Sequence, residues 1–200
     1  FNMDYKEYIK DCMESEPPKN SVEEAYKVFP AFMKQDTEEG KKENYNAIHD
    51  SFKELDQIFY KEHQEVLLPK AGLYLMSLVD TMSVMSQEIF EHYKYFETLY
   101  KKALKKVLAF YQEETSLFPT NLNHPADSNN PVDITGTFMI AYAVLKGCRM
   151  KAILSEKYLD MGKAMYQAAE KIIGKEAMDT LDAPLEMKLA YEEYKKAVDK

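Results

Sequence analysis

The side chains best suited to metal chemistry are spread thinly along this chain. The four histidines are His49, His63, His92 and His124. A carboxylate-bridged di-iron bundle needs a glutamate three residues before a histidine on an inward helix face, and no histidine in this chain has one. Glu88 and His92 are four residues apart, a spacing typical of a surface contact along a helix. No histidine and cysteine cluster has zinc spacing, so the sequence predicts no metal site.

Patterns typical of nucleophilic catalysis or nucleotide binding are also absent. The sequence contains no Gly-x-Ser-x-Gly, no P-loop and no Gly-x-Gly-x-x-Gly. Its two cysteines, Cys12 and Cys148, lie in apolar helical patterns. This placement favours buried thiols over a disulfide. We therefore expect no cofactor.

Aromatic residues are the more unusual feature of the composition. The chain has 15 Tyr and 10 Phe but no Trp. Tyr93, Tyr95 and Tyr100 have helical spacing, at which tyrosines more often form the edge of a core than a sugar site. The polar loop around Thr120 to Pro125 offers hydrogen-bonding groups, and such a composition is typical of turns.

The overall composition describes an acidic globular chain. It has 200 residues, 46% hydrophobic and 30% charged, with a formal net charge of −8. Nucleic acid is not an expected partner, because phosphate contacts need a clustered basic face. No apolar run approaches the roughly 18 residues of a membrane span, so we expect no membrane partner. The expected compartment is the cytoplasm; because the chain begins at Phe1, a secreted protein whose leader was removed stays open as an alternative.

Glycine and proline are clustered, which leaves long stretches with apolar residues at helical spacing. The predicted helices are 3–15, one capped by Ser21, one carrying 45–59, 72–85, one from 86 or 91 to 112, 132–150, one capped by Ser155 and reaching 173, and one opened by Pro184. Pro30 is expected to kink or end the second helix. The pattern predicts an all-α fold, with residues 1–200 forming a single helical domain.

Two of these helices lack a wide polar face. The helices that begin near Gly72 and Val132 are therefore expected to be among the most buried. Glycine inside a helix is unfavourable by roughly 0.5–1 kcal/mol relative to alanine. Gly136 and Gly147 are thus expected to mark close packing or a helix end rather than a phosphate site.

The most informative stretch, residues 130–149, has the sequence NPVDITGTFMIAYAVLKGCR. It resembles the unsaturated uronyl hydrolases, glycoside hydrolase families 88 and 105, which typically read Asn-Tyr-Leu-Glu-Thr-Ser and then a small-residue helix ending near Lys-Gly-x-Arg. Residues 72–80, GLYLMSLVD, are similar to the helix after the family's Trp-x-Arg-Gly-Asn-Gly-Trp. Residues 22–33 are similar to the helix that starts with the family's catalytic Asp. The family-like region covers about residues 19–194.

This resemblance implies a fold and a chemistry. The family's fold is an (α/α)6 barrel of twelve helices, so a chain with about eight would form a shortened α/α toroid. Family members hydrate the double bond of an unsaturated uronic acid at the end of an oligosaccharide. An Asp acts as general acid and base, which needs no metal. An oligosaccharide is therefore the small-molecule partner that the resemblance implies.

Several positions depart from the family's pattern. Glu23 and Glu24 stand where the family has its catalytic Asp, and they are the catalytic candidates. The family's Arg and Trp are replaced by Pro69 and Leu73. The residues that the resemblance would place around the substrate are His63, Lys70, Phe118 and Asn130.

The sequence leads to a glycoside hydrolase-like scaffold whose active site is degraded or doubtful. One alternative is an active hydrolase of unsaturated uronyl oligosaccharides. Another is a non-catalytic interaction or structural protein, because an incomplete ring leaves apolar helix faces for a second copy or a protein partner to cover. A third is an unrelated helical bundle.

Overall fold

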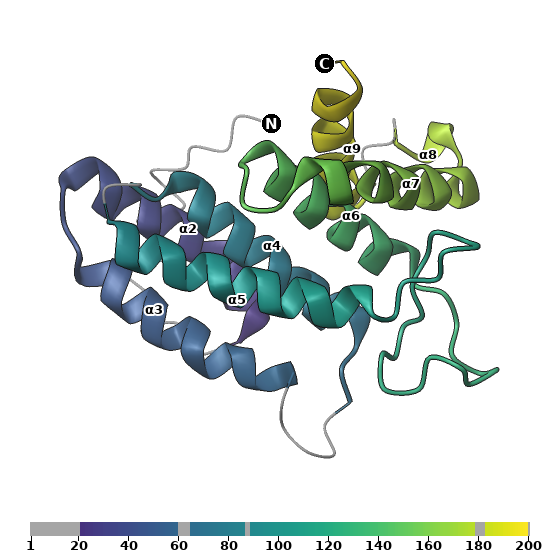
Figure 1. Cartoon of the computed structure of the whole chain (residues 1–200), viewed down its shortest axis with the longest axis horizontal. Helices are drawn as coiled ribbons and strands as arrows, with labels where there is room; N and C mark the ends of the chain where they lie inside the picture. Colours follow the sequence, from purple (N-terminus) through teal and green to yellow (C-terminus); the bar gives the residue numbers. More distant parts are fainter. Residues whose placement is uncertain (1–20, 60–64, 87–88, 179–182, 200) are drawn as a thin grey trace.

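The computed structural model of the chain describes residues 21–59, 65–86, 89–178 and 183–199. This part of the chain is helical, and its only β pairings are isolated bridges. The helices are α2 (Val22–Glu39), α3 (Glu43–Leu55), the short 3-10 helix η1 (Asp56–Phe59), α4 (Leu68–Val84), α5 (Phe90–Leu108), α6 (Ile134–Arg149), α7 (Ser155–Ile173), α8 (Lys175–Met178) and α9 (Leu185–Val198) (Figure 1). The predicted all-α class is confirmed.

Helix α2 begins where the sequence predicts and ends later than Pro30 suggests. The Ser21 side chain accepts a hydrogen bond from the backbone N–H of Glu24 at 3.2 Å, which caps the first turn. Of the two effects expected of Pro30, an early end of the helix is contradicted, since α2 continues to Glu39. Proline removes one backbone hydrogen bond from the helix. Phe29 before Pro30 and Met33 after it are both buried in the core, and this packing stabilises the helix on either side of the proline.

Helices α4 and α6 form the centre of the core, as predicted. Eleven residues of α4 and twelve of α6 are buried. Helix α4 starts at Leu68, four residues before the predicted start, with Pro69 in its first turn. Proline is favourable there because the first N–H groups of a helix have no intrahelical partner. Helix α6 is capped by Asp133, whose side chain accepts from Gly136 N–H at 2.7 Å.

The helices alternate between an inner and an outer layer, as in an α/α toroid. Gly136 near the start of α6 contacts Leu68 at the start of α4, and Lys146 near the end of α6 pairs with Asp80 near the end of α4. The two inner helices are therefore parallel. The outer helix α7 packs antiparallel to α6, because Phe138 meets Tyr166 while Ser155 bonds Cys148. The predicted shortened toroid is confirmed (Figure 1).

Close approach of the helices depends on glycine. A Cβ on Gly136 would lie 2.5 Å from Leu68, and one on Gly72 would lie 2.7 Å from Met139. A Cβ on Gly147 would overlap the hydroxyl of Tyr100. The predicted packing role of Gly136 and Gly147 is therefore confirmed.

Other expectations are settled only in part. Cys148 is a buried free thiol, and burial raises its pKa to about 11. The predicted helix 3–15 lies outside the described residues, as do Cys12, His63 and Glu88. Among the described helices, none combines the length and apolar character that a bilayer span requires.

Candidate functional site

The candidate site lies where the first turn of α4 meets the long segment between α5 and α6. Leu68 N–H donates to Thr120 O at 2.7 Å, and Leu122 N–H donates to Val66 O at 2.9 Å. Thr120 N–H in turn donates to Pro131 O at 2.9 Å. These backbone bonds join three chain segments, around residues 66–68, 120–122 and 131, at the amino-terminal ends of α4 and α6. We call this arrangement the platform.

Asn130 fastens this platform from within. Its Nδ2 donates to Asn121 O at 2.7 Å and to His124 O at 2.9 Å, and its Oδ1 accepts from Asn121 N–H at 2.9 Å. Both N–H groups of the amide are therefore engaged by the loop itself. Asn130 shapes the loop, and its hydrogen-bonding groups are largely used there.

Phe118 packs beneath the surface of the platform, in the hydrophobic core. Its side chain is 0% exposed, and its ring lies 5.5 Å from that of Tyr111. Its backbone carbonyl accepts from Asp133 N–H at 3.0 Å, which ties it to the cap of α6. The ring therefore presents no surface on which a sugar could stack.

Lys70 and the two glutamates occupy the first turns of their helices. Lys70 is exposed and has no hydrogen-bond or ion-pair partner among the described residues. Glu23 is exposed, whereas Glu24 is half-buried. The Oε2 atom of Glu24 is buried, and no described residue forms a hydrogen bond with it. Of the two candidate glutamates, Glu24 is therefore the one with a carboxyl oxygen that is shielded from water and unpaired among the described residues.

A second polar cluster lies further along the inner helices, and sequence reasoning did not single it out. Asp80 Oδ1 accepts from Lys146 Nζ and from Tyr142 Oη, each at 2.6 Å, and Lys146 Nζ is 2.9 Å from Tyr142 Oη. Burial, together with the negative charge of Asp80, raises the pKa of Tyr142 well above its usual value. The tyrosine therefore stays a hydrogen-bond donor, and the cluster joins α4 to α6.

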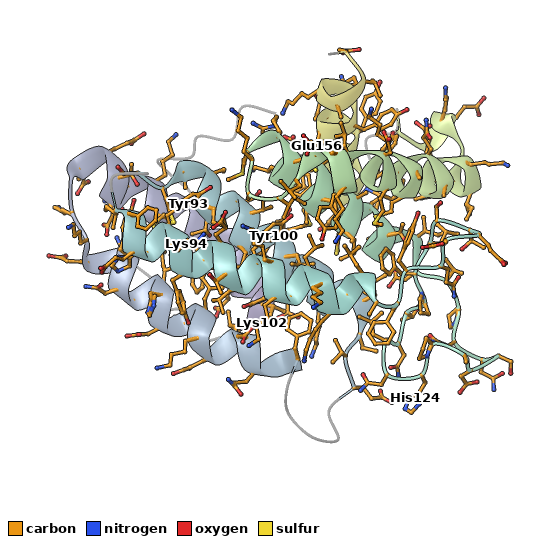
Figure 2. The ribbon with its side chains drawn as sticks, in the orientation of Figure 1. Tyr93, Lys94, Tyr100, Lys102, His124 and Glu156 are labelled. Carbon is orange, nitrogen blue, oxygen red and sulfur yellow. The ribbon has the colours of Figure 1, made fainter. Side chains whose placement is uncertain are left out.

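The Lys-Gly-x-Arg sequence at the end of α6 proves to be a junction of four helices. Lys146 reaches α4 through Asp80, and Gly147 lets Tyr100 of α5 approach; Tyr100 is labelled in Figure 2. Arg149 reaches α9 through Glu193, with N···O distances of 2.7 and 3.0 Å. Each residue of the motif therefore has a packing or pairing role at one neighbouring helix.

The Glu193 carboxylate is strongly held at this junction. It is 5% exposed and also accepts from Lys196 at 2.9 Å. Burial alone would raise the pKa of Glu193, but the hydrogen bonds from Arg149 and Lys196 outweigh it and lower the pKa below its usual value. Glu193 is therefore a structural carboxylate.

The residues gathered at the platform limit its chemistry. The exposed Lys70 at the platform can attract an anionic substrate. Glu24, in the first turn of α2, is a half-buried carboxyl group that can exchange a proton. Among the described residues, no group of three or more histidine, cysteine, aspartate or glutamate side chains has the arrangement of a metal site. The predicted residues Lys70, Phe118 and Asn130 share this end of the fold, although only Lys70 has free polar groups directed to solvent.

The family model described as Glycosyl Hydrolase Family 88 matches residues 71–196. The chain belongs to this family. A search of curated proteins gave no match.

Solved structures share the fold at low sequence identity. A family 105 glycoside hydrolase from C. acetobutylicum ATCC 824 has a TM-score of 0.75 at 14% identity, covering 94% of this chain and 72% of its own. A family 88 glycosyl hydrolase from Bacteroides vulgatus has a TM-score of 0.73 at 14% identity, covering 96% and 67%. A protein described as a polysaccharide lyase has a TM-score of 0.67 at 16% identity, covering 98% and 67%. Hydrolase and lyase names thus occur on one fold, so the fold alone does not select the reaction.

Proposed function

We propose that this chain keeps the scaffold of the unsaturated uronyl hydrolases while turning over such saccharides slowly or not at all. The observation that carries the proposal is the state of the predicted substrate residues. Phe118 is fully buried, and the amide of Asn130 is bonded to its own loop. Neither supports a sugar ring as the resemblance implies. We also propose that the chain forms one domain over residues 1–200.

The remaining chemistry would rest on Glu24 and Lys70. Glu24 is the better acid–base candidate of the two glutamates, because Glu23 is exposed to solvent. General acid–base help contributes about 100- to 10,000-fold when the carboxyl group is well placed. Displacement of a reacting group by about 1 Å can remove about 100-fold of such a gain. A glutamate in place of the family's aspartate, with few partners to orient it, supports a weak or absent activity.

The test is turnover of an unsaturated uronyl disaccharide, followed by loss of the ultraviolet absorbance of its conjugated double bond. Glu24→Gln and Glu23→Gln are compared with Glu38→Gln, a control in the last turn of the same helix. We expect the turnover rates of the wild type and of the three variants to match the protein-free background. Robust turnover that disappears in Glu24→Gln and survives in Glu38→Gln would establish an active hydrolase instead.

A second candidate, a non-catalytic interaction protein, is supported by apolar surface on the last helices. Ile172 and Leu185 are each 57% exposed, and Val198 is 46% exposed. Surfaces of this kind are commonly covered by another protein when they are contiguous. Native mass spectrometry tests this candidate: a dimer that Leu185→Glu dissociates would support it, and a monomer at micromolar concentration would count against self-association.

A further inference from the structure

A pair of histidines bridges the two outer helices α3 and α5, which lie side by side in Figure 1. His49 comes from α3 and His92 from α5, and their ring centroids are 5.8 Å apart. The pair is separate from the platform at the ends of α4 and α6. Nothing in the proposed function uses it.

Each ring has one nitrogen engaged by an oxygen atom. His49 Nδ1 lies 3.2 Å from Asp50 Oδ1, and His92 Nε2 lies 3.1 Å from Asn46 Oδ1. Carboxylate and amide oxygens only accept hydrogen bonds, so the engaged nitrogens must carry the protons. In the neutral rings, the lone pairs are then on His49 Nε2 and His92 Nδ1. Neither of these atoms has a hydrogen-bond partner among the described residues.

The surrounding aromatic rings hold both imidazoles in place. The His49 ring packs on Tyr95 at 4.0 Å and meets Phe96 edge-on at 6.2 Å. The His92 ring meets Tyr45 edge-on at 5.9 Å. The two imidazoles therefore lose little conformational freedom when a ligand orders them further.

We propose that His49 and His92 together bind one divalent transition metal ion of the Zn²⁺, Ni²⁺ and Cu²⁺ class, through His49 Nε2 and His92 Nδ1. Two imidazoles on one ion at the usual metal–nitrogen length have centroids about 5.2 Å apart at the tetrahedral angle and about 6.4 Å apart when they lie opposite each other, and the observed 5.8 Å lies between these values. The oxygen partners of the other ring nitrogens match the outer shell that metal-binding histidines have. With two protein ligands, water completes the coordination, so the affinity is moderate.

The experiment is a calorimetric titration of the whole chain with ZnCl₂, NiCl₂ and CuCl₂, each alone, alongside thermal melts. We expect one site per chain, a melting temperature that rises with metal concentration, and the tightest binding for Cu²⁺. His49→Ala and His92→Ala should each abolish this site. The controls are His63→Ala and His124→Ala; Figure 2 shows His124 on the long loop, away from α3.

A variant that keeps both imidazoles separates loss of a metal ligand from a general loss of structure. Asn46→Ala leaves both imidazoles but removes the oxygen that orients His92, and it should weaken binding about 10- to 100-fold. Circular dichroism checks that every variant keeps its helices. Unchanged binding in His49→Ala or His92→Ala, loss of binding in His63→Ala or His124→Ala, or no binding by the unmodified protein would overturn the proposal.

Discussion

Replacing Gly147 by alanine tests whether the end of α6 is closed by contact with α5. A Cβ at this position would overlap the Tyr100 hydroxyl and lie 2.9 Å from the ring Cζ atom. Tyr100 is 0% exposed, and its hydroxyl donates to Ala143 O at 2.8 Å, so the ring has little room to move. Overpacking of this kind destabilises by about 1–3 kcal/mol. The better helix propensity of alanine returns about 0.5–1 kcal/mol.

The middle of each range gives an expected net loss of about 1 kcal/mol in the free energy of unfolding, and the extremes are about 0 and 2.5 kcal/mol. For a chain of this size, each kcal/mol lowers the melting temperature by roughly 2–4 °C. Urea denaturation followed by circular dichroism measures the free energy directly. A stabilising Gly147→Ala would refute the packing argument.

A double-mutant cycle makes the argument specific. Tyr100→Phe alone should cost about 1 kcal/mol for the lost hydrogen bond, and it removes the atom nearest to the new Cβ. The double variant should therefore be less destabilised than the sum of the single variants, by at least about 0.5 kcal/mol. Gly136→Ala is the matched control, because it lies at the other end of α6 and faces Leu68. Its effect should add to that of Tyr100→Phe, and additivity of Gly147→Ala as well would contradict the proposed contact.

Three further predictions concern stability. Thr81 is fully buried, and its Oγ1 has no hydrogen-bond partner among the residues that the structure describes, so Thr81→Val should raise the free energy of unfolding by about 1 kcal/mol in urea denaturation; a loss would reveal a hidden bond. Ser21→Ala removes the cap of α2 and should cost about 1 kcal/mol by the same method, with no change expected if the cap is unimportant. The pKa of Glu193 is lower in the folded chain than in the unfolded one. Its contribution to the free energy of unfolding is therefore fully present above an unfolded pKa of about 4.3 and is lost as the pH falls through the folded pKa. Melting temperatures of the wild type and of Glu193→Gln should accordingly converge below about pH 4, and a constant gap would contradict the assignment.

Helix identity was predictable because it depends on local spacing. The stripe of Tyr45, Ile48 and Phe52 in α3 is buried along one face, as its spacing indicates. Helix ends were less predictable: α5 stops at Leu108, because the chain then turns and Gln112 N–H donates to Leu117 O at 3.0 Å. That bond joins residues beyond the helix, and no apolar period records it.

Contacts between helices were not predictable from spacing alone. Asp80 and Lys146 lie in different helices, so their ion pair depends on how α4 and α6 pack. The same reason hid the His49 and His92 pair, since a search for ligands at fixed spacing along one helix does not find it. The family resemblance named Lys70, Phe118 and Asn130, but it carried no information on how their side chains are oriented in the folded loop. Burial of Phe118 and the bonds of Asn130 follow from the folded loop.

We propose that the chain keeps the scaffold of the unsaturated uronyl hydrolases but turns over such saccharides slowly or not at all. A single-turnover measurement, with protein in excess over an unsaturated uronyl disaccharide, tests it most directly, because weak binding is then less able to hide chemistry. We expect the absorbance to decay at the same rate with the wild type, with Glu24→Gln and without protein. A wild-type decay at least about 100-fold faster than that of Glu24→Gln, the lower end of what a placed acid–base group provides, would contradict it.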